Sequence, residues 1–262
     1  MCAQEPDYNF TNRYVNDNIG RNRPSFQKMR LFGTYYREDE MFWPESTQSI
    51  ELKSDEYFYP KKILTFLGKE APEKLTLYGN YSLLSSKMIM VCGARNASQS
   101  GIDLACKCGR MIAECGFTVL SGYARGVDLA AHIGALEAGG KTIAALPYGL
   151  SRFRMHKDLQ DSYNPDSFLL ISEFPLWQVF TAHSAFRRNK LMTALADAVI
   201  VIEPGETGGT WYSAEKASEM GKRLYFLEGE RPEIIPYLES LGGERVCVEN
   251  GFPNLKEILE EV

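Results

Sequence analysis

The chain has 262 residues, of which 44% are hydrophobic and 24% charged, a composition typical of a soluble globular protein. It has no uninterrupted apolar run of about 18 residues, and its first residues are polar and acidic, so we expect a cytoplasmic protein without a membrane segment or a secretory signal. The net charge of −5 argues against a surface coated with basic residues for duplex DNA, but it leaves room for a local basic groove.

Cysteine usage indicates a reducing compartment. The spacings contain no Cys-x-x-Cys pair, so we expect no zinc site, and free cysteine in an apolar helix usually acts as a small hydrophobic residue. We therefore expect reduced thiols and no cofactor. The six cysteines are Cys2, Cys92, Cys106, Cys108, Cys115 and Cys247.

The first part of the chain differs from the rest. Residues 1–55 are rich in Asn, Asp, Glu, Arg and aromatic residues and show little periodicity, so we interpret them as an N-terminal extension. From about Tyr59 the pattern becomes regular, and we predict one domain over residues 56–262.

That domain alternates short apolar runs with helical patterns. Each run is apolar on both faces, as a strand buried in a parallel sheet must be. The alternation predicts an α/β fold: a Rossmann-like, doubly wound, mainly parallel sheet with helices on both faces. The predicted strands are Met88–Cys92, Phe117–Leu120, Thr142–Leu146, Phe168–Ile171, Ala198–Ile202 and Arg223–Leu227.

The predicted helices lie between these strands. The segment 101–116 carries an apolar stripe that includes Ile102, Cys108 and Ile112, and Gly116 follows as its stop. A second helix covers the segment that begins at Val127, and later helices are predicted over Asn189–Ala196 and Trp211–Met220. His132 lies on the apolar side of its helix and is interpreted as a core histidine.

Two glycine-rich loops follow apolar strands and lead into helices. The first runs from Gly93 to Gly101 and the second from Glu203 to Thr210. Such loops bring backbone N–H groups and a helix N-terminus to one point, which attracts phosphate. If the strand Ala198–Ile202 lies beside Met88–Cys92, both loops open into one crevice at the point where the strand order reverses. The pair of loops therefore predicts a phosphate-binding crevice.

Basic residues cluster near the same edge. Arg95 lies in the first loop and Arg125 follows the second strand, while Arg187, Arg188 and Lys190 directly precede the apolar part of a predicted helix. Cations near a helix N-terminus are disfavoured by about 0.3–1 kcal/mol each, which suggests an anionic partner that offsets this cost. The alternative is internal ion pairing, with Glu173 or Asp128 as partner.

Motifs for catalysis are missing from the sequence. There is no nucleophile elbow with Ser, His and Asp, no Walker A sequence, and no GxGxxG followed by an acidic residue about twenty positions later. We therefore expect a binding protein and not an enzyme.

Taken together, these segments resemble the DprA/Smf family of bacterial DNA-processing proteins. The resemblance runs from about Tyr59 to Val262, and its strongest part is SGYARGVDLAAHIGALEAGGKTIAAL at Ser121–Leu146. VCGARNASQSG at Val91–Gly101 is similar to the family's first glycine loop, and SEFP, RRNK and GGTWYSA follow in order.

The resemblance implies a Rossmann-like domain that binds single-stranded DNA, forms a homodimer and helps to load a RecA-type recombinase during uptake or recombination of DNA. It places DNA-facing roles on side chains of the loops and of the RRNK segment. With the loop glycines included, the predicted DNA and phosphate site comprises Gly93, Arg95, Ser98, Gly101, Arg125, Gly126, Arg187, Arg188, Asn189, Lys190, Gly208, Gly209 and Thr210.

A rival interpretation is a nucleotide-binding sensor or nucleotide-processing enzyme of the lysine-decarboxylase-like (LOG) group. PGETGGT at Pro204–Thr210 is similar to that group's loop, but Ser213 stands where its catalytic glutamate should be and Glu215 comes two positions later. For the DNA-binding interpretation, we predict that Arg95→Glu or Arg188→Glu abolishes oligonucleotide binding and leaves the melting temperature nearly unchanged.

Overall fold

The computed structural model describes residues 29–31, 34–36, 49–205, 208–227 and 232–262. The chain divides into two units, Met1–Phe42 and Trp43–Val262. In the first unit, β1 (Met29–Leu31) and β2 (Thr34–Tyr36) pair as an antiparallel ribbon. Most of the predicted extension 1–55 lies outside the described residues. Its segment Ile50–Lys53, however, forms a strand of the main sheet.

The second unit is built on a nine-stranded sheet with the order β11-β10-β9-β5-β6-β7-β8-β4-β3. The strands from β11 to β8 run parallel, β4 is antiparallel to β8, and β3 is antiparallel to β4. The strand bounds are β3 (Ile50–Lys53), β4 (Lys74–Gly79), β5 (Met88–Gly93), β6 (Thr118–Ser121), β7 (Lys141–Ala145), β8 (Phe168–Ser172), β9 (Ala198–Ile202), β10 (Arg223–Leu227) and β11 (Glu244–Val246).

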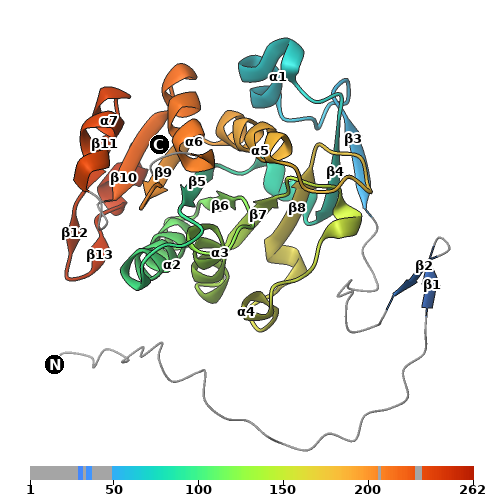
Figure 1. Cartoon of the computed structure of the whole chain (residues 1–262), viewed down its shortest axis with the longest axis horizontal. Coiled ribbons are helices and arrows are strands. Elements are labelled where there is room, and N and C mark those ends of the chain that lie inside the picture. The colour runs from blue at the N-terminus through green and yellow to red at the C-terminus, as the bar shows by residue number, and fades with distance from the viewer. Residues whose placement is uncertain (1–28, 32–33, 37–48, 206–207, 228–231) are drawn as a thin grey trace, which may run out of the picture. The chain divides into compact units, whose positions relative to one another are not determined.

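Helices cover both faces of this sheet (Figure 1). One face packs against α1 (Lys61–Leu67), α5 (Ala182–Leu195), α6 (Gly209–Glu219) and α7 (Ile235–Ser240). The other face packs against α2 (Gln99–Glu114), α3 (Val127–Glu137), α4 (Lys157–Gln160) and α8 (Lys256–Glu260). A short pair of strands, β12 (Val248–Glu249) and β13 (Phe252–Pro253), precedes α8. The predicted Rossmann-like, doubly wound α/β class is confirmed.

The central strands are buried because both of their faces are apolar. All five residues of β8 and of β9 are buried, as are the first five of β5. The strands β5 and β9 are parallel neighbours, with Gly93 opposite Ile202 at their carboxyl ends. The condition for a shared crevice is therefore met: both glycine loops leave the sheet at the point where the strand order reverses.

The helix α5 begins seven residues before the predicted start at Asn189. Thr181 caps it, since the Thr181 hydroxyl accepts a hydrogen bond from the Ser184 N–H and the Ser184 side chain accepts one from the Thr181 N–H. The first turns of α5 are mostly polar, so apolar periodicity did not show them. Arg187, Arg188 and Lys190 consequently lie within the helix and not at its N-terminus, and the helix-dipole argument for an anionic partner is wrong.

Two smaller expectations concern the interior. His132 is fully buried, as predicted for a core histidine. Cys106 and Cys108 are buried in α2, but Cys115 at the end of that helix is exposed. Among the residues that the structure describes, no helix is long and apolar enough to cross a membrane.

Candidate nucleic-acid interface

Three loops meet at the carboxyl ends of the parallel strands, and we call them the crest: residues 93–98, 122–126, and 203–205 with 208–210. The Thr210 hydroxyl donates a 2.9 Å hydrogen bond to the Gly93 carbonyl, which ties the third loop to the first. The Val127 N–H donates to the Ala94 carbonyl at 3.3 Å, which ties the second loop to the first. The predicted crevice loops are therefore physically joined.

Gly126 allows that close approach between loops. It precedes α3 with a φ of 81°, and a Cβ atom at this position would lie 2.5 Å from the Ala94 carbonyl oxygen. Gly208 precedes α6 with a φ of 111° and is exposed, with no atom near the position of a Cβ. Both glycines thus have a positive φ, which favours glycine. At Gly126 the lack of a side chain also permits the close contact with Ala94, whereas Gly208 lies at the open surface.

The N-terminus of α2 already holds an anionic group of the protein itself. The Glu203 carboxylate accepts hydrogen bonds from the Ser98 N–H at 2.8 Å and from the Ser98 hydroxyl at 2.5 Å. A Cβ on Gly101 would lie 2.5 Å from this carboxyl group. Ser98 and Gly101 therefore form a cradle for Glu203, and a direct contact of theirs with DNA phosphate stays a prediction.

Sequence reasoning missed Glu203. The residue is buried and has a φ of 42°, in the left-handed region that few residues other than glycine adopt. The available signal was an acidic residue placed directly after a fully buried strand, at the same edge as a serine that caps a helix. An internal carboxylate at a helix N-terminus is stabilised by the helix dipole in the same way as a bound phosphate would be.

Arg188 is buried beneath the crest, with 5% of its surface exposed. Its guanidinium donates to the Gly122 carbonyl and, at 2.8 Å, to the Ala145 carbonyl, at the ends of β6 and β7. The buried carboxylate of Asp128 lies alongside, since a Cβ on Gly122 would contact both groups. In this structure Arg188 is buried and clamps two strand ends, which argues against the predicted contact with DNA; that contact stays a prediction.

Burial and the neighbouring opposite charge shift the pKa values of Asp128 and Arg188 in opposite directions. Burial raises the pKa of Asp128, and the nearby Arg188 guanidinium opposes this rise. Burial likewise lowers the pKa of Arg188, and Asp128 opposes that fall. The two buried charges therefore offset each other, although they form no salt bridge; the internal ion pair with Asp128 that was the alternative from the sequence is present only as this longer-range interaction.

The other members of the RRNK segment are also engaged internally. Arg187 forms a 2.6 Å ion pair with Glu173, whose side chain is only 3% exposed. Lys190 forms a 2.7 Å ion pair with Glu70. The Asn189 amide donates a 2.8 Å hydrogen bond to the Gly209 carbonyl and so fixes the start of α6. The segment supports the crest from below, and direct DNA contacts by its side chains stay predictions.

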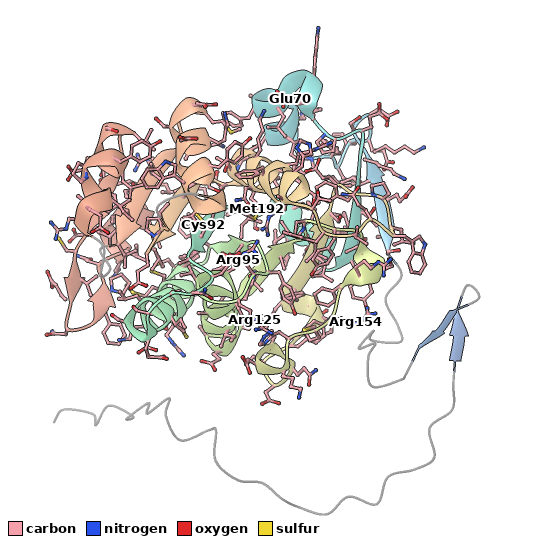
Figure 2. All side chains as sticks on the ribbon, in the orientation of Figure 1. Glu70, Cys92, Arg95, Arg125, Arg154 and Met192 are labelled. Atoms are coloured by element: carbon pink, nitrogen blue, oxygen red, sulfur yellow. The ribbon has the colours of Figure 1, made fainter. Side chains whose placement is uncertain are left out.

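Arg95 and Arg125 have the opposite environment. Both side chains are exposed on crest loops, and neither forms an ion pair with a carboxylate of the described chain. The Arg95 guanidinium lies 5.7 Å from the centre of the Phe180 ring. Figure 2 shows Arg95 between α2 and α5, and Arg125 near α3. Among the described residues of the crest, these two arginines are exposed cations that form no salt bridge. Arg95 also opposes, less than Arg188 does, the rise in the pKa of the buried Asp128.

The environment of Ser213 and Glu215 bears on the rival nucleotide interpretation. Ser213 is fully buried and its hydroxyl donates to the Gly209 carbonyl at 2.9 Å. Glu215 accepts a 2.7 Å hydrogen bond from the Tyr237 hydroxyl of α7. Both side chains are thus engaged within the α6 region. Ser213 has no carboxylate, and the carboxylate of Glu215 is bound by Tyr237.

Comparisons with known proteins agree with this architecture. The family model for DNA recombination-mediator protein A matches residues 51–242. Protein Smf of Escherichia coli is 32% identical over 198 residues, which cover 73% of this chain and 51% of that protein. The chain thus spans about half the length of this relative.

Two solved structures show similar folds. DNA processing protein A from Streptococcus pneumoniae superposes with a TM-score of 0.67 at 27% identity, covering 77% of this chain and 71% of the other. DNA processing protein A from Helicobacter pylori superposes with a TM-score of 0.68 at 24% identity, covering 82% of this chain and 95% of the other. The match of the family model over most of the chain places this protein in the DNA recombination-mediator protein A family of DprA/Smf DNA-processing proteins.

Proposed function

We propose that the crest binds single-stranded DNA, with Arg95 and Arg125 as its principal phosphate contacts. The observation that carries this proposal is a difference in exposure and salt bridges: these two guanidinium groups are exposed and form no salt bridge in the described chain. They lie on joined loops at the switch point of a doubly wound sheet, where such folds bind their ligands. A polyanion supplies the missing negative charge.

The chemistry favours a single strand over a duplex. The net charge of −5 argues against a surface coated with basic residues, so we expect the attraction to be local. Phe180 lies beside Arg95 and is 48% exposed, so an apolar ring and a cation are offered together. Unstacked bases gain about 1–3 kcal/mol each by stacking on aromatic rings, whereas duplex bases are already stacked. The Helicobacter pylori protein, which has a similar fold, binds single-stranded DNA.

The proposal extends to the setting in which such a complex acts. We infer that the protein binds the strand without catalysing a reaction on it, works as a homodimer, and assists a RecA-type recombinase in loading during uptake or recombination of DNA. Membership of the recombination-mediator family supports this extension. Sedimentation of the protein at several concentrations tests the dimer, and recombinase filament formation on strands with and without the protein tests the loading role.

The experiment for DNA binding is fluorescence anisotropy of a labelled oligo-dT across a salt series. The logarithm of the affinity should fall with the logarithm of salt concentration, by a slope of about 0.7 for each phosphate neutralised. Arg95→Glu should weaken binding at least tenfold with an unchanged melting temperature, because its side chain is exposed. Binding of a mononucleotide but of no oligonucleotide would favour the nucleotide sensor instead.

Lys141→Glu is the matched control for this variant. Lys141 is an exposed residue at the start of β7, so it lies at the opposite edge of the sheet from the crest. The same reversal of charge there should leave oligonucleotide binding within about twofold of the wild type. Equal losses in the two variants would show that only net charge matters, and the proposed site would be wrong.

A further inference from the structure

Beside the crest lies a second surface segment, which we call the arginine ledge: residues 149–154 with residues 175–180. The two stretches are joined along their backbones. The Gly149 N–H donates to the Gln178 carbonyl at 3.0 Å, and the Ser151 N–H donates to the Leu176 carbonyl at 3.2 Å. The loop after β7 and the loop before α5 therefore form one continuous piece of surface.

The ledge carries two arginines that sequence reasoning did not single out, Arg152 and Arg154. Both are exposed, and neither lies in an ion pair with a carboxylate among the described residues. Their guanidinium groups are held by neutral backbone: Arg154 donates to the Phe153 carbonyl at 2.7 Å, and Arg152 donates to the Trp177 carbonyl at 3.5 Å. Carbonyl contacts orient these groups without cancelling their charge.

The ledge is attached to the crest on two sides. At one end, the Phe180 ring lies 5.7 Å from the Arg95 guanidinium. At the other, the Tyr123 hydroxyl donates to the Arg154 carbonyl at 3.2 Å, and Tyr123 precedes Arg125 by two residues in the same crest loop. In the view of Figure 2, Arg125 lies below Arg95, and Arg154 lies to the right of Arg125. The four arginines thus belong to two neighbouring and connected segments.

Apolar side chains are exposed between these arginines. Trp177 is 46% exposed and Val179 is 56% exposed, in addition to Phe180. The nearest acidic residue after Arg154 along the chain, Asp158, lies 3.3 Å from His156 and forms no salt bridge with Arg152 or Arg154. Phosphate-binding cations alternating with apolar surface are what proteins use to hold single strands, since the backbone and the unstacked bases both find partners.

We propose that the arginine ledge is a second phosphate-binding segment, so that one DNA strand contacts Arg95 and Arg125 on the crest and then Arg152 and Arg154 on the ledge. This inference rests on the proposed function of the crest and deepens it. It defines the ligand as a single strand long enough to reach both segments. A mononucleotide or a very short oligonucleotide would occupy the crest alone.

The test is a length series of oligo-dT, from about 4 to about 16 nucleotides, the range of site sizes known for single-strand-binding folds. The variant is Arg152→Gln/Arg154→Gln, which keeps hydrogen-bond donors for the carbonyl groups and removes the charge. It should bind the short oligonucleotides as the wild type does, but lose most of the gain in affinity that the wild type shows with length. With the long oligonucleotides, its salt slope should fall by about 1.4, for two phosphates at about 0.7 each.

Two further variants complete the design. Arg152→Lys/Arg154→Lys keeps the charge and should restore most of the salt slope, which a purely structural role of the arginines would not predict. Lys141→Gln/Lys256→Gln removes two exposed charges elsewhere and should keep the wild-type length dependence. Lys256 lies beside Cys115, at the end of α2 that points away from the crest.

The outcomes separate this inference from the proposed function. Wild-type length dependence and salt slope in the glutamine pair would overturn the ledge and leave the crest intact. Failure of the wild-type protein to bind any oligonucleotide would overturn the proposed function itself. If the glutamine pair is destabilised, as shown by its melting temperature, both pairs are compared below that temperature: a slope reduced in the glutamine pair and restored in the lysine pair supports the ledge, and an equal reduction of about 1.4 in both pairs overturns it.

Discussion

Two groups of basic residues lie near the same edge of the sheet, and they have opposite environments. Arg187, Arg188 and Lys190 belong to α5, and each faces a carboxylate: Glu173, Asp128 and Glu70 respectively. Arg95 and Arg125 belong to loops, are exposed, and form no salt bridge in the described chain. Density of basic residues in the sequence therefore does not distinguish these two groups, and we propose that charge compensation in the folded protein indicates which of them binds DNA.

The largest expected effect comes from the buried member of the first group. Arg188→Ala leaves the Asp128 carboxylate buried without its cation, which typically costs about 3–5 kcal/mol of unfolding free energy. Urea denaturation measures this loss, and the melting temperature should fall with it, contrary to the expectation from sequence for Arg188→Glu. The double variant Arg188→Met/Asp128→Leu should be less destabilised than the sum of its single variants. A stable Arg188→Ala variant that has lost DNA binding would place Arg188 in the interface after all.

The buried charge of Arg188 also acts on His132. Burial, with a further contribution from Arg188, lowers the pKa of His132 to about 3. The Thr142 hydroxyl donates to the Val119 carbonyl, so it accepts from His132 Nδ1–H, and Nε2 has no partner among the described residues. The imidazole is therefore neutral in the folded protein.

The pH dependence follows from this shift. Between about pH 6.5 and pH 3 the unfolded chain binds a proton at His132 and the folded chain does not, so stability falls as pH falls. The contribution is about 1.36 kcal/mol per pH unit, or about 2 kcal/mol at pH 5. The unfolding free energy of the wild type minus that of His132→Asn, measured from pH 7 to pH 5, isolates this term from other titrating groups. A flat difference would show that His132 is protonated in the folded state.

The smallest effect is expected for Lys190. The side chain of its partner Glu70 is 71% exposed, and ion pairs at the surface contribute little to stability. Lys190→Ala should leave the urea midpoint within experimental error and oligonucleotide binding within about twofold of the wild type. A tenfold loss of binding with normal stability would return Lys190 to the interface and weaken the contrast between the two groups.

The sequence predicted the central sheet well because its strands are apolar on both faces. The adjacency of β5 and β9 followed from the doubly wound pattern, and with it the meeting of the glycine loops. The strands β3, β4 and β11 were not predicted: β3 is exposed at most positions and carries no such signal, and β11 has only three residues.

The site was less predictable because the burial and the binding partners of its side chains depend on residues that are far apart in the chain. Arg188 meets Asp128, which lies sixty positions earlier, and Ser98 meets Glu203, which lies more than a hundred positions later. Nothing local in the RRNK segment distinguishes a buried arginine from an exposed one. Arg152 and Arg154 escaped notice for the opposite reason, since they lie in a loop without glycine-rich character and only the fold brings them beside Tyr123 and Phe180.

One measurement tests the central claim most directly: photocrosslinking of an oligo-dT with photoreactive bases to the wild-type protein, followed by mapping of the crosslinked peptides. We expect crosslinks in the peptides around Arg95, Arg125 and the arginine ledge. The opposite edge of the sheet provides a rival site within the same molecule, a cleft of about 370 Å³ lined by Lys61, Lys62 and Lys87. Crosslinks confined to peptides of that cleft, with none at the crest, would contradict the assignment of the DNA-binding surface to the crest.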